Sequence, residues 1–262
     1  MHMSPSRNTS GPLTARSVLA SVLLGTDPPR LPTALLVRTA ALFGIAEGTA
    51  RTALSRMVSA GEADAEDGSY RLVGRLVARQ TRQTASRRAD TRPWDGTWEL
   101  ATIDGDQRRS AADRAALRDA LRGRRLVELR EGVWGRPDNL DPDRSPEDAL
   151  VMQEWCTRWS EARPRPVPDA TVAFGVETWA TQAVELRADM ARDLPHLERG
   201  ELDALAPGFV TSAAVLRHLQ ADPLLPPELL SSDWPGGGLR ADYDTYDAAY
   251  RRVLRVWFRS ES

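Results

Sequence analysis

Apolar residues in the first third of the chain recur at helical spacing in three short segments. From Thr14 to Leu24 they lie at i, i+3, i+4, i+7 and i+8, and a glycine and two prolines follow. A second stripe follows Thr33, an expected N-cap, and stops at Gly44, which can adopt the positive φ of a tight turn. A third stripe covers residues 47–60. The pattern predicts three helices, the last two joined by the short turn Gly44–Ala46.

The third predicted helix has an apolar face and a polar face. At 100° per residue, the side opposite the apolar stripe carries small, hydroxyl and guanidinium side chains, with Arg51 beside them: Gly48, Thr52, Ser55, Arg56 and Ser59. Arginine can bind guanine edges or phosphates, and hydroxyls can contact phosphates or bases. A helix-turn-helix needs such a second helix after a short turn. An ordinary three-helix packing unit with a solvated face would show the same pattern.

Two short extended segments follow, at residues 62–65 and 69–73, with Glu66, Asp67 and Gly68 between them. An Asp-Gly pair between extended segments is a strong β-hairpin signal. The hairpin after the three helices predicts a winged helix. Because its first half is acidic, phosphate should repel it, and we do not expect the tip to lie deep in a minor groove.

Arginines then accumulate against a single acidic residue, Asp90. They are Arg71, Arg75, Arg79, Arg82, Arg87, Arg88 and Arg92. Such a stretch is suited to phosphate contacts with strongly salt-dependent affinity. A solvated linker helix explains the same residues equally well.

The remainder alternates between strand and helix patterns. Residues 97–103 predict a strand, Ser110 with Asp113 predicts a capping box that opens a helix, and residues 127–134 predict a hairpin. A helix that ends near residue 162 and a strand at 171–176 complete a ferredoxin-like α+β unit. From Thr178 onward the pattern is helical. The last helix carries a stripe expected to be core or dimer contact: Tyr243, Tyr246, Tyr250, Val253, Leu254 and Trp257.

Charge and tryptophan content change near residues 88–93. Residues 1–92 hold 13 arginines against 7 acidic residues, whereas residues 93–262 hold 22 against 30, and all eight tryptophans lie in the second part. We therefore predict an α+β protein with a domain boundary here. The predicted parts are a disordered tail (1–13), a winged-helix DNA-binding domain (14–74), a basic linker (75–93), a ferredoxin-like middle domain (94–176) and a helical C-terminal domain (177–262).

Candidate catalytic chemistry is sparse. Asp104 and Asp106 could hold Mg²⁺, but two carboxylates in a polar turn are usually only a turn. We expect Cys156 to be buried on an apolar helix, His196 to lie in a loop or helix start, and His218 to lie in a polar-faced helix, without partners for a triad. The expectation is a protein that is not an enzyme and holds no metal or cofactor. Without a signal peptide or a membrane-length apolar run, it should be cytoplasmic.

Five segments stand out beyond these patterns. They are TARTALSRMVSAGE (49–62), SYRLVGR (69–75), WDGTWEL (94–100), GVWGRP (132–137) and DPLLPPELLSSDWPG (222–236). In this order they resemble the PaaX family of bacterial transcriptional repressors of phenylacetic acid degradation. The resemblance implies an N-terminal winged helix, a ferredoxin-like middle domain and a helical C-terminal domain. It also implies a homodimer on a palindromic operator in double-stranded DNA, with phenylacetyl-CoA or another acyl-CoA as the effector.

Matched to the family's recognition helix and wing, and extended over the same polar surface, the predicted DNA-binding residues are Thr49, Arg51, Thr52, Ser55, Arg56, Ser59, Tyr70, Arg71 and Arg75. Residues 101–106 and 138–168 depart from the family pattern, and no effector-binding residue is assigned. Two other function classes stay open. One is a metal-dependent nuclease on the middle domain using Asp104 and Asp106. The other is a scaffold whose winged helix docks protein.

Overall fold

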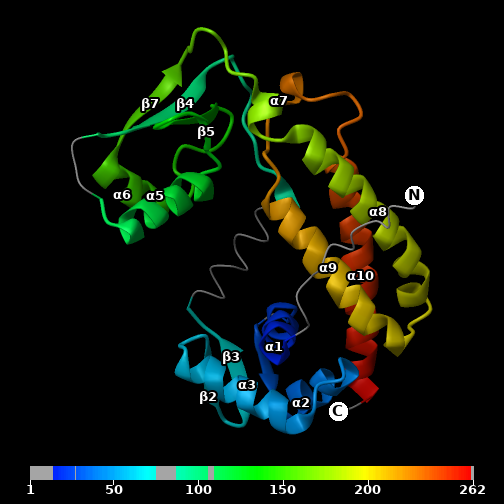
Figure 1. The fold of residues 1–262 in the computed structure, drawn as a ribbon. Helices are drawn as coiled ribbons and strands as arrows, with labels where there is room; N and C mark the ends of the chain where they lie inside the picture. The colour runs from blue at the N-terminus through cyan, green and yellow to red at the C-terminus, as the bar shows by residue number, and fades with distance from the viewer. Residues whose placement is uncertain (1–13, 27, 75–86, 106–108, 261–262) are drawn as a thin grey trace, which may run out of the picture. The chain divides into compact units, whose positions relative to one another are not determined.

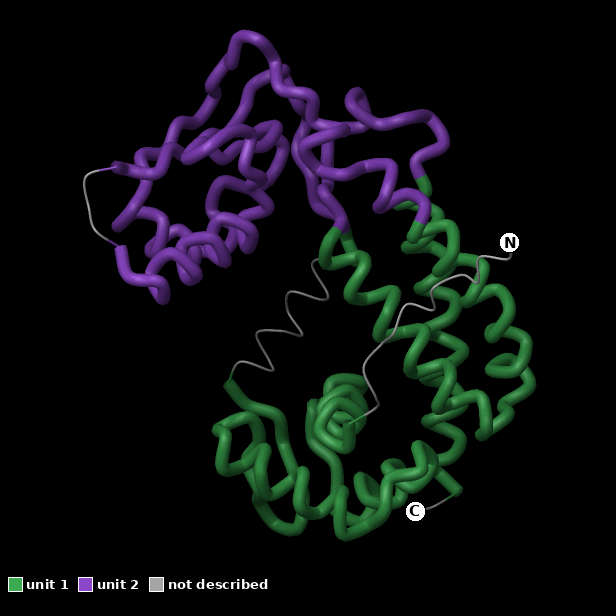
Figure 2. Tube along the Cα trace, in the orientation of Figure 1, with its two compact units in different colours: residues 1–88, 182–221, 235–262 green, residues 89–181, 222–234 purple. Residues whose placement is uncertain are grey.

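The computed structural model describes residues 14–26, 28–74, 87–105 and 109–260. The chain divides into two compact units (Figure 2): unit 1 comprises residues 1–88, 182–221 and 235–262, and unit 2 comprises residues 89–181 and 222–234. The predicted tail, Arg75, Arg79, Arg82 and Asp106 lie outside the described residues. None of the described helices combines the length and apolar character needed to span a bilayer.

Three helices open unit 1 at the predicted places. They are α1 (Ala15–Leu24), α2 (Thr33–Leu42) and α3 (Glu47–Ser59), and Thr14 caps α1 in a capping box with Ser17. Most residues of their apolar stripes are buried, with Leu19, Leu36 and Leu54 fully inaccessible. The prediction that Thr33 caps α2 is wrong, because Pro32 occupies that position. The Thr33 hydroxyl instead donates to the Gly68 carbonyl at 2.8 Å.

A three-stranded antiparallel sheet completes this part of unit 1. β2 (Ala63–Glu66) and β3 (Ser69–Leu72) form the predicted hairpin, and both turn residues, Asp67 and Gly68, have positive φ, 49° and 69°. β1 (Arg30–Pro32) pairs with the other edge of β3, so the strand order is β1-β3-β2. The sequence did not predict β1, because three residues are too few to show alternation.

Helices make up the rest of unit 1. They are α8 (Val176–Glu198), which belongs to this unit from residue 182, the 3-10 turn η1 (Leu202–Ala204), α9 (Leu205–Gln220) and α10 (Gly236–Ser260). The last two lie side by side (Figure 1). They approach closely at Gly208, where a Cβ would lie 3.2 Å from the Tyr246 hydroxyl. In the predicted stripe on α10, every member except the half-buried Leu254 is buried, so the stripe is core.

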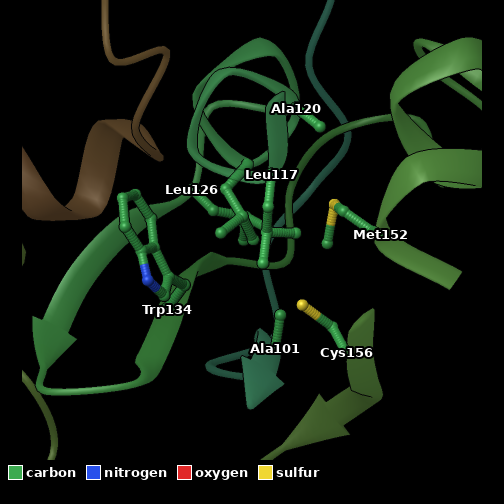
Figure 3. Close-up of a cluster of buried hydrophobic side chains, with 8 residues drawn as sticks. Ala101, Leu117, Ala120, Leu126, Trp134, Met152 and Cys156 are labelled. Carbon is green, nitrogen blue, oxygen red and sulfur yellow. The ribbon is translucent and has the colours of Figure 1, made fainter. Parts of the chain in front are cut away.

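Unit 2 is built on a four-stranded sheet. Along the chain come β4 (Trp98–Ile103), α5 (Ala111–Gly123), β5 (Val127–Arg130), β6 (Val133–Pro137), α6 (Pro146–Trp155) and β7 (Cys156–Ala162). The strand order is β5-β6-β4-β7 and every neighbouring pair is antiparallel. The two helices pack side by side over one face (Figure 1). Figure 3 shows the core below them, where Leu117, Met152 and Cys156 point into one interior.

Two elements of unit 2 differ from the prediction. The helix expected to reach residue 162 ends at Trp155, and the next seven residues are β7. The strand expected at 171–176 is instead the short helix α7 (Ala170–Ala173). Pairing with β4 makes β7 an edge strand. Because all but its two end residues are exposed, β7 lacks the apolar alternation that identifies a strand.

The opposite face of this sheet is covered by irregular chain. Trp98 of β4 packs with Ala170 of α7 and Leu225, and the turn η2 (Pro227–Leu229) lies beside them. Arg136 of β6 is completely buried and forms hydrogen bonds with the segment that contains Leu224 and Leu225. Its guanidinium donates to the Leu224 carbonyl at 2.9 Å and to Asn139 Oδ1 at 2.8 Å. Burial lowers the pKa of Arg136 to about 9.

A second buried arginine belongs to an ion cluster in the same unit. Glu99 of β4 accepts from Arg124 at 3.1 Å and also from Arg144, while Arg158 reaches it at 3.3 Å. Burial alone would raise the pKa of Glu99, but the charges and hydrogen bonds of Arg144 and Arg124 more than offset it, so its pKa lies below the ordinary value.

Candidate nucleic-acid interface

The polar face predicted for the third helix is exposed on α3. Ala50, Ala53, Leu54 and Met57 are buried. The predicted contact residues of this helix all lie exposed on the remaining surface: Thr49, Arg51, Thr52, Ser55, Arg56 and Ser59. Val58, predicted on the apolar side, is 38% exposed at the margin. The helix therefore brings together six of the nine predicted site residues.

The side chains on this face differ in how far they are already bonded. Arg51 pairs with Glu47 one turn earlier at 2.8 Å. The Thr52 hydroxyl donates to the Gly48 carbonyl at 2.8 Å, and the Ser59 hydroxyl to the Ser55 carbonyl at 3.2 Å. Among the described residues, none pairs with the guanidinium of Arg56. Arg56 is thus the cation on α3 whose donors are available to a ligand.

The acidic residues of the hairpin are mostly paired with arginine. Asp64 pairs with Arg71 at 2.9 Å, and Glu66 lies 3.8 Å from Arg30. Glu62 precedes the hairpin, is buried, and pairs with Arg16. Repulsion between the hairpin and phosphate is therefore weaker than the sequence suggests, because three of the four carboxylates have a cation beside them.

Strand β1, which pairs with the hairpin, brings a further basic residue to this edge that the sequence did not predict. Arg30 of β1 lies opposite Arg71 of β3, and both are exposed. Tyr70, the other predicted residue here, is half-buried opposite Ala65 and Leu31. Only strand pairing brings Arg30 to this edge, and no local signal in three residues could have shown it.

Two arginines of the predicted basic linker form ion pairs with other residues of the protein. Arg87 pairs with Asp244 at 2.6 Å and Asp247 at 3.0 Å and lies over the ring of Tyr243. Arg92 pairs with Asp138 at 2.9 Å in unit 2. Among the linker positions that the structure describes, Arg88 alone is an exposed arginine without an ion pair.

Asp247 also links α10 to α1. It pairs with Arg251 at 2.9 Å, and Arg251 donates to the carbonyl of Gly25, the C-cap of α1, at 2.9 Å. Burial would lower the pKa of Arg87, but its hydrogen bond to Asp244 and the charge of Asp247 raise it. This cluster holds α10 against the three-helix part of unit 1.

The remaining candidate residues are scattered. Asp104 is exposed and accepts from the Thr157 hydroxyl at 3.0 Å. Within the described ranges no group of three or more histidine, cysteine or acidic residues could hold a metal ion. Cys156 begins β7 rather than lying on a helix, and burial followed by the Asp104 charge raises its pKa to about 11. His196 lies in the last turn of α8, not in a loop, and contacts Glu201, while His218 is buried in α9.

Comparison with known proteins gives two matches. A family profile described as PaaX-like protein matches residues 14–76, the segment that contains α1 to α3 and the hairpin. Among solved structures, the chain is similar to the uncharacterized protein Rv0674 from Mycobacterium tuberculosis. The two are 39% identical over 93% of this chain and 98% of that chain, with a TM-score of 0.73. A search of curated proteins gives no match.

Proposed function

Because the chain belongs to the family of PaaX-like proteins, we propose that it is a DNA-binding transcriptional regulator, a repressor that binds a palindromic operator as a homodimer. The observation that carries this proposal is the exposed face of α3. It holds an arginine that no described residue pairs with, among hydroxyl side chains and within the segment that the family profile matches. Such a face fits the chemistry of a DNA major groove.

In this proposal α1, α2, α3 and the β2–β3 hairpin act as a winged helix. α3 enters the major groove, where Arg56 can donate two hydrogen bonds to a guanine edge. Thr49 lies in the first turn of α3, where the helix dipole favours a phosphate. Tyr70 and Arg71 on the hairpin are proposed to contact the adjoining backbone, and so is Arg75, which follows them in the sequence.

The fold of unit 2 supports the same assignment. We propose that unit 2 is the ferredoxin-like domain that the PaaX resemblance implies, and its succession β-α-β-β-α-β with strand order β5-β6-β4-β7 supports this proposal. We propose that a small aromatic acyl-CoA or related effector shifts the protein away from the conformation that binds DNA. A two-fold dimer would place its half-sites one helical turn, about 34–36 Å, or a multiple apart.

The test begins with a duplex enriched by the wild-type protein from a random DNA pool. Binding of that duplex is measured by fluorescence anisotropy for wild type, Arg56→Ala and the control Arg118→Ala. Arg118 is an exposed arginine on α5 in unit 2. Arg56→Ala should weaken binding about 10- to 100-fold, since a bidentate base contact is worth about 1–3 kcal/mol, while the melting temperature stays unchanged.

The control variant should bind like wild type, and phenylacetyl-CoA should release the duplex. A wild-type protein that enriches no sequence from the pool would contradict the proposed function. Equal losses in Arg56→Ala and Arg118→Ala would remove α3 from the DNA interface.

A further inference from the structure

The last turns of α10 carry a basic stripe consisting of Arg252, Arg255 and Arg259. These residues are spaced i, i+3 and i+7, so they share one face of the helix, and all three are exposed. Val256, on the same face, is 53% exposed. On the other side Val253 and Trp257 are buried, at 3% and 8% exposure. The helix end is therefore packed on one side and basic on the other.

The basic stripe lacks the carboxylates that accompany several other exposed arginines of unit 1. Arg51 and Arg71 each pair with an acidic residue, as do Arg192 and Arg199 near the end of α8. No carboxylate in the described part of the chain pairs with any member of the stripe, and Arg255 reaches only the Arg251 carbonyl, at 3.3 Å. Within the described part of the chain, its charge is therefore not balanced by an ion pair.

Stabilisation of the helix does not account for the basic stripe. Cations favour a helix dipole within its last turn, which here can include Arg259. Arg252 lies two turns before the end, where this effect has decayed. The stripe extends over about 10 Å of helix, at 1.5 Å per residue.

The basic stripe belongs to the same compact unit as the candidate interface. It begins one residue after Arg251, whose guanidinium binds the Gly25 carbonyl at the end of α1. α1 in turn packs against α3 within the same unit. Unit 1 as a whole holds 21 arginines against 16 acidic residues, so its charge favours a polyanion as the occupant.

We propose that the basic stripe of α10 binds backbone phosphates of double-stranded DNA beside the site that α3 occupies. The proposal rests on the DNA-binding function proposed above and adds a second, sequence-independent contact. A DNA strand offers about one phosphate per 3.4 Å of axis, so about three phosphates lie within the length of the stripe. Arginine binds phosphate with paired hydrogen bonds and releases the condensed counterions.

The test replaces the three arginines together, as Arg252→Gln, Arg255→Gln and Arg259→Gln. A control triple, Arg187→Gln, Arg192→Gln and Arg199→Gln, removes the same charge from paired arginines of the same unit. Binding of the enriched duplex and of an unrelated duplex is measured from low to high salt. Thermal unfolding checks that both triples fold, and the three single variants replace the triple if it does not.

The stripe variant should bind both duplexes about 10- to 100-fold more weakly at low salt, with an unchanged preference between them. The slope of log affinity against log salt should fall in magnitude by about 2–3, at about 0.9 per lost phosphate contact, and by about 0.9 in each single variant. The control triple should keep the wild-type slope.

A stripe variant with the slope of wild type, or of the control triple, would overturn the proposal. So would a changed oligomeric state in size-exclusion chromatography with an unchanged slope, because the basic stripe would then be a protein contact. A wild-type protein that binds neither duplex would refute the proposed function itself. That result differs from failure of the stripe alone.

Discussion

The two compact units use the same cation in opposite ways. Unit 1 holds 21 arginines against 16 acidic residues, and no described arginine in it is buried. Unit 2 holds 14 against 21, yet Arg124 and Arg136 are completely buried in it. In unit 2 two buried arginines donate to carbonyls and Glu99 in the interior, whereas the described arginines of unit 1 are exposed or half-buried. The partners of each arginine are therefore more informative about DNA binding than the number of arginines in a unit.

The largest effect expected within the protein comes from Arg136→Met. The substitution leaves Asn139 Oδ1 without its Arg136 donor and removes the Arg136 hydrogen bonds to the buried carbonyls of Pro223 and Leu224, of which Leu224 keeps a bond from Asn139 Nδ2. Unsatisfied buried acceptors cost about 1–3 kcal/mol each, so we expect a loss of about 4 kcal/mol in the free energy of unfolding. Urea unfolding followed by tryptophan fluorescence measures it, because seven of the eight tryptophans belong to unit 2.

Arg130→Met on the same sheet is the control, since Arg130 is exposed and its loss should change stability by no more than about 0.5 kcal/mol. Equal free energies of unfolding for the two variants would show that the buried arginine contributes no more to stability than the exposed one.

A smaller loss, about 3 kcal/mol, is expected for Glu99→Gln. The amide leaves Arg124 and Arg144 without their carboxylate, and uncompensated buried charge is destabilising. The pH dependence follows from the same ion cluster. Because the folded pKa of Glu99 lies below its ordinary value of 4.5, the unfolded chain takes up the proton first as the pH falls.

The contribution of Glu99 is therefore present above about pH 4.5 and lost below it. Urea midpoints of unit 2 between pH 3 and pH 7 should fall more steeply for wild type than for Glu99→Gln. Parallel curves would show that Glu99 does not stabilise the unit through its charge.

The smallest effect, about 1 kcal/mol, is expected for Asp247→Asn in unit 1. Asp247 is 13% exposed and pairs with Arg87 and Arg251, which are themselves partly solvated, so screening limits its contribution. Thermal unfolding at low and high salt should show a difference from wild type that shrinks with salt. Asp189→Asn, which loses an exposed pair with Arg192, serves as control. An equal or larger change in the control would mean that the link between α10 and α1 is not specially stabilising.

Local patterns predicted most of the elements. The helices α1 to α3 and the turn at Asp67 and Gly68 were predicted from short-range periodicity and turn chemistry, and the capping box at Ser110 and Asp113 is present at the start of α5. The two missed strands have one cause. β1 and β7 are strands because of the neighbours they pair with, and neither contains the alternation that reports a half-buried strand.

For the candidate site, the sequence predicted which face of α3 is exposed, because helical geometry determines faces. It did not predict the state of each arginine. Arg87 and Arg92 looked like phosphate ligands and are held in intramolecular ion pairs. Helical spacing on α10 predicted the apolar positions on one side and gave no role to the basic stripe on the other side.

The sequence by itself determined the helices, the hairpin turn and the resemblance to a family, since all of these depend on residues close together in the chain. Only the tertiary structure decided which charges are free. Arg87 meets Asp247 across 160 positions and Arg16 meets Glu62 across 46. Coulomb energy depends on distance in space and on burial, and neither follows from separation along the chain.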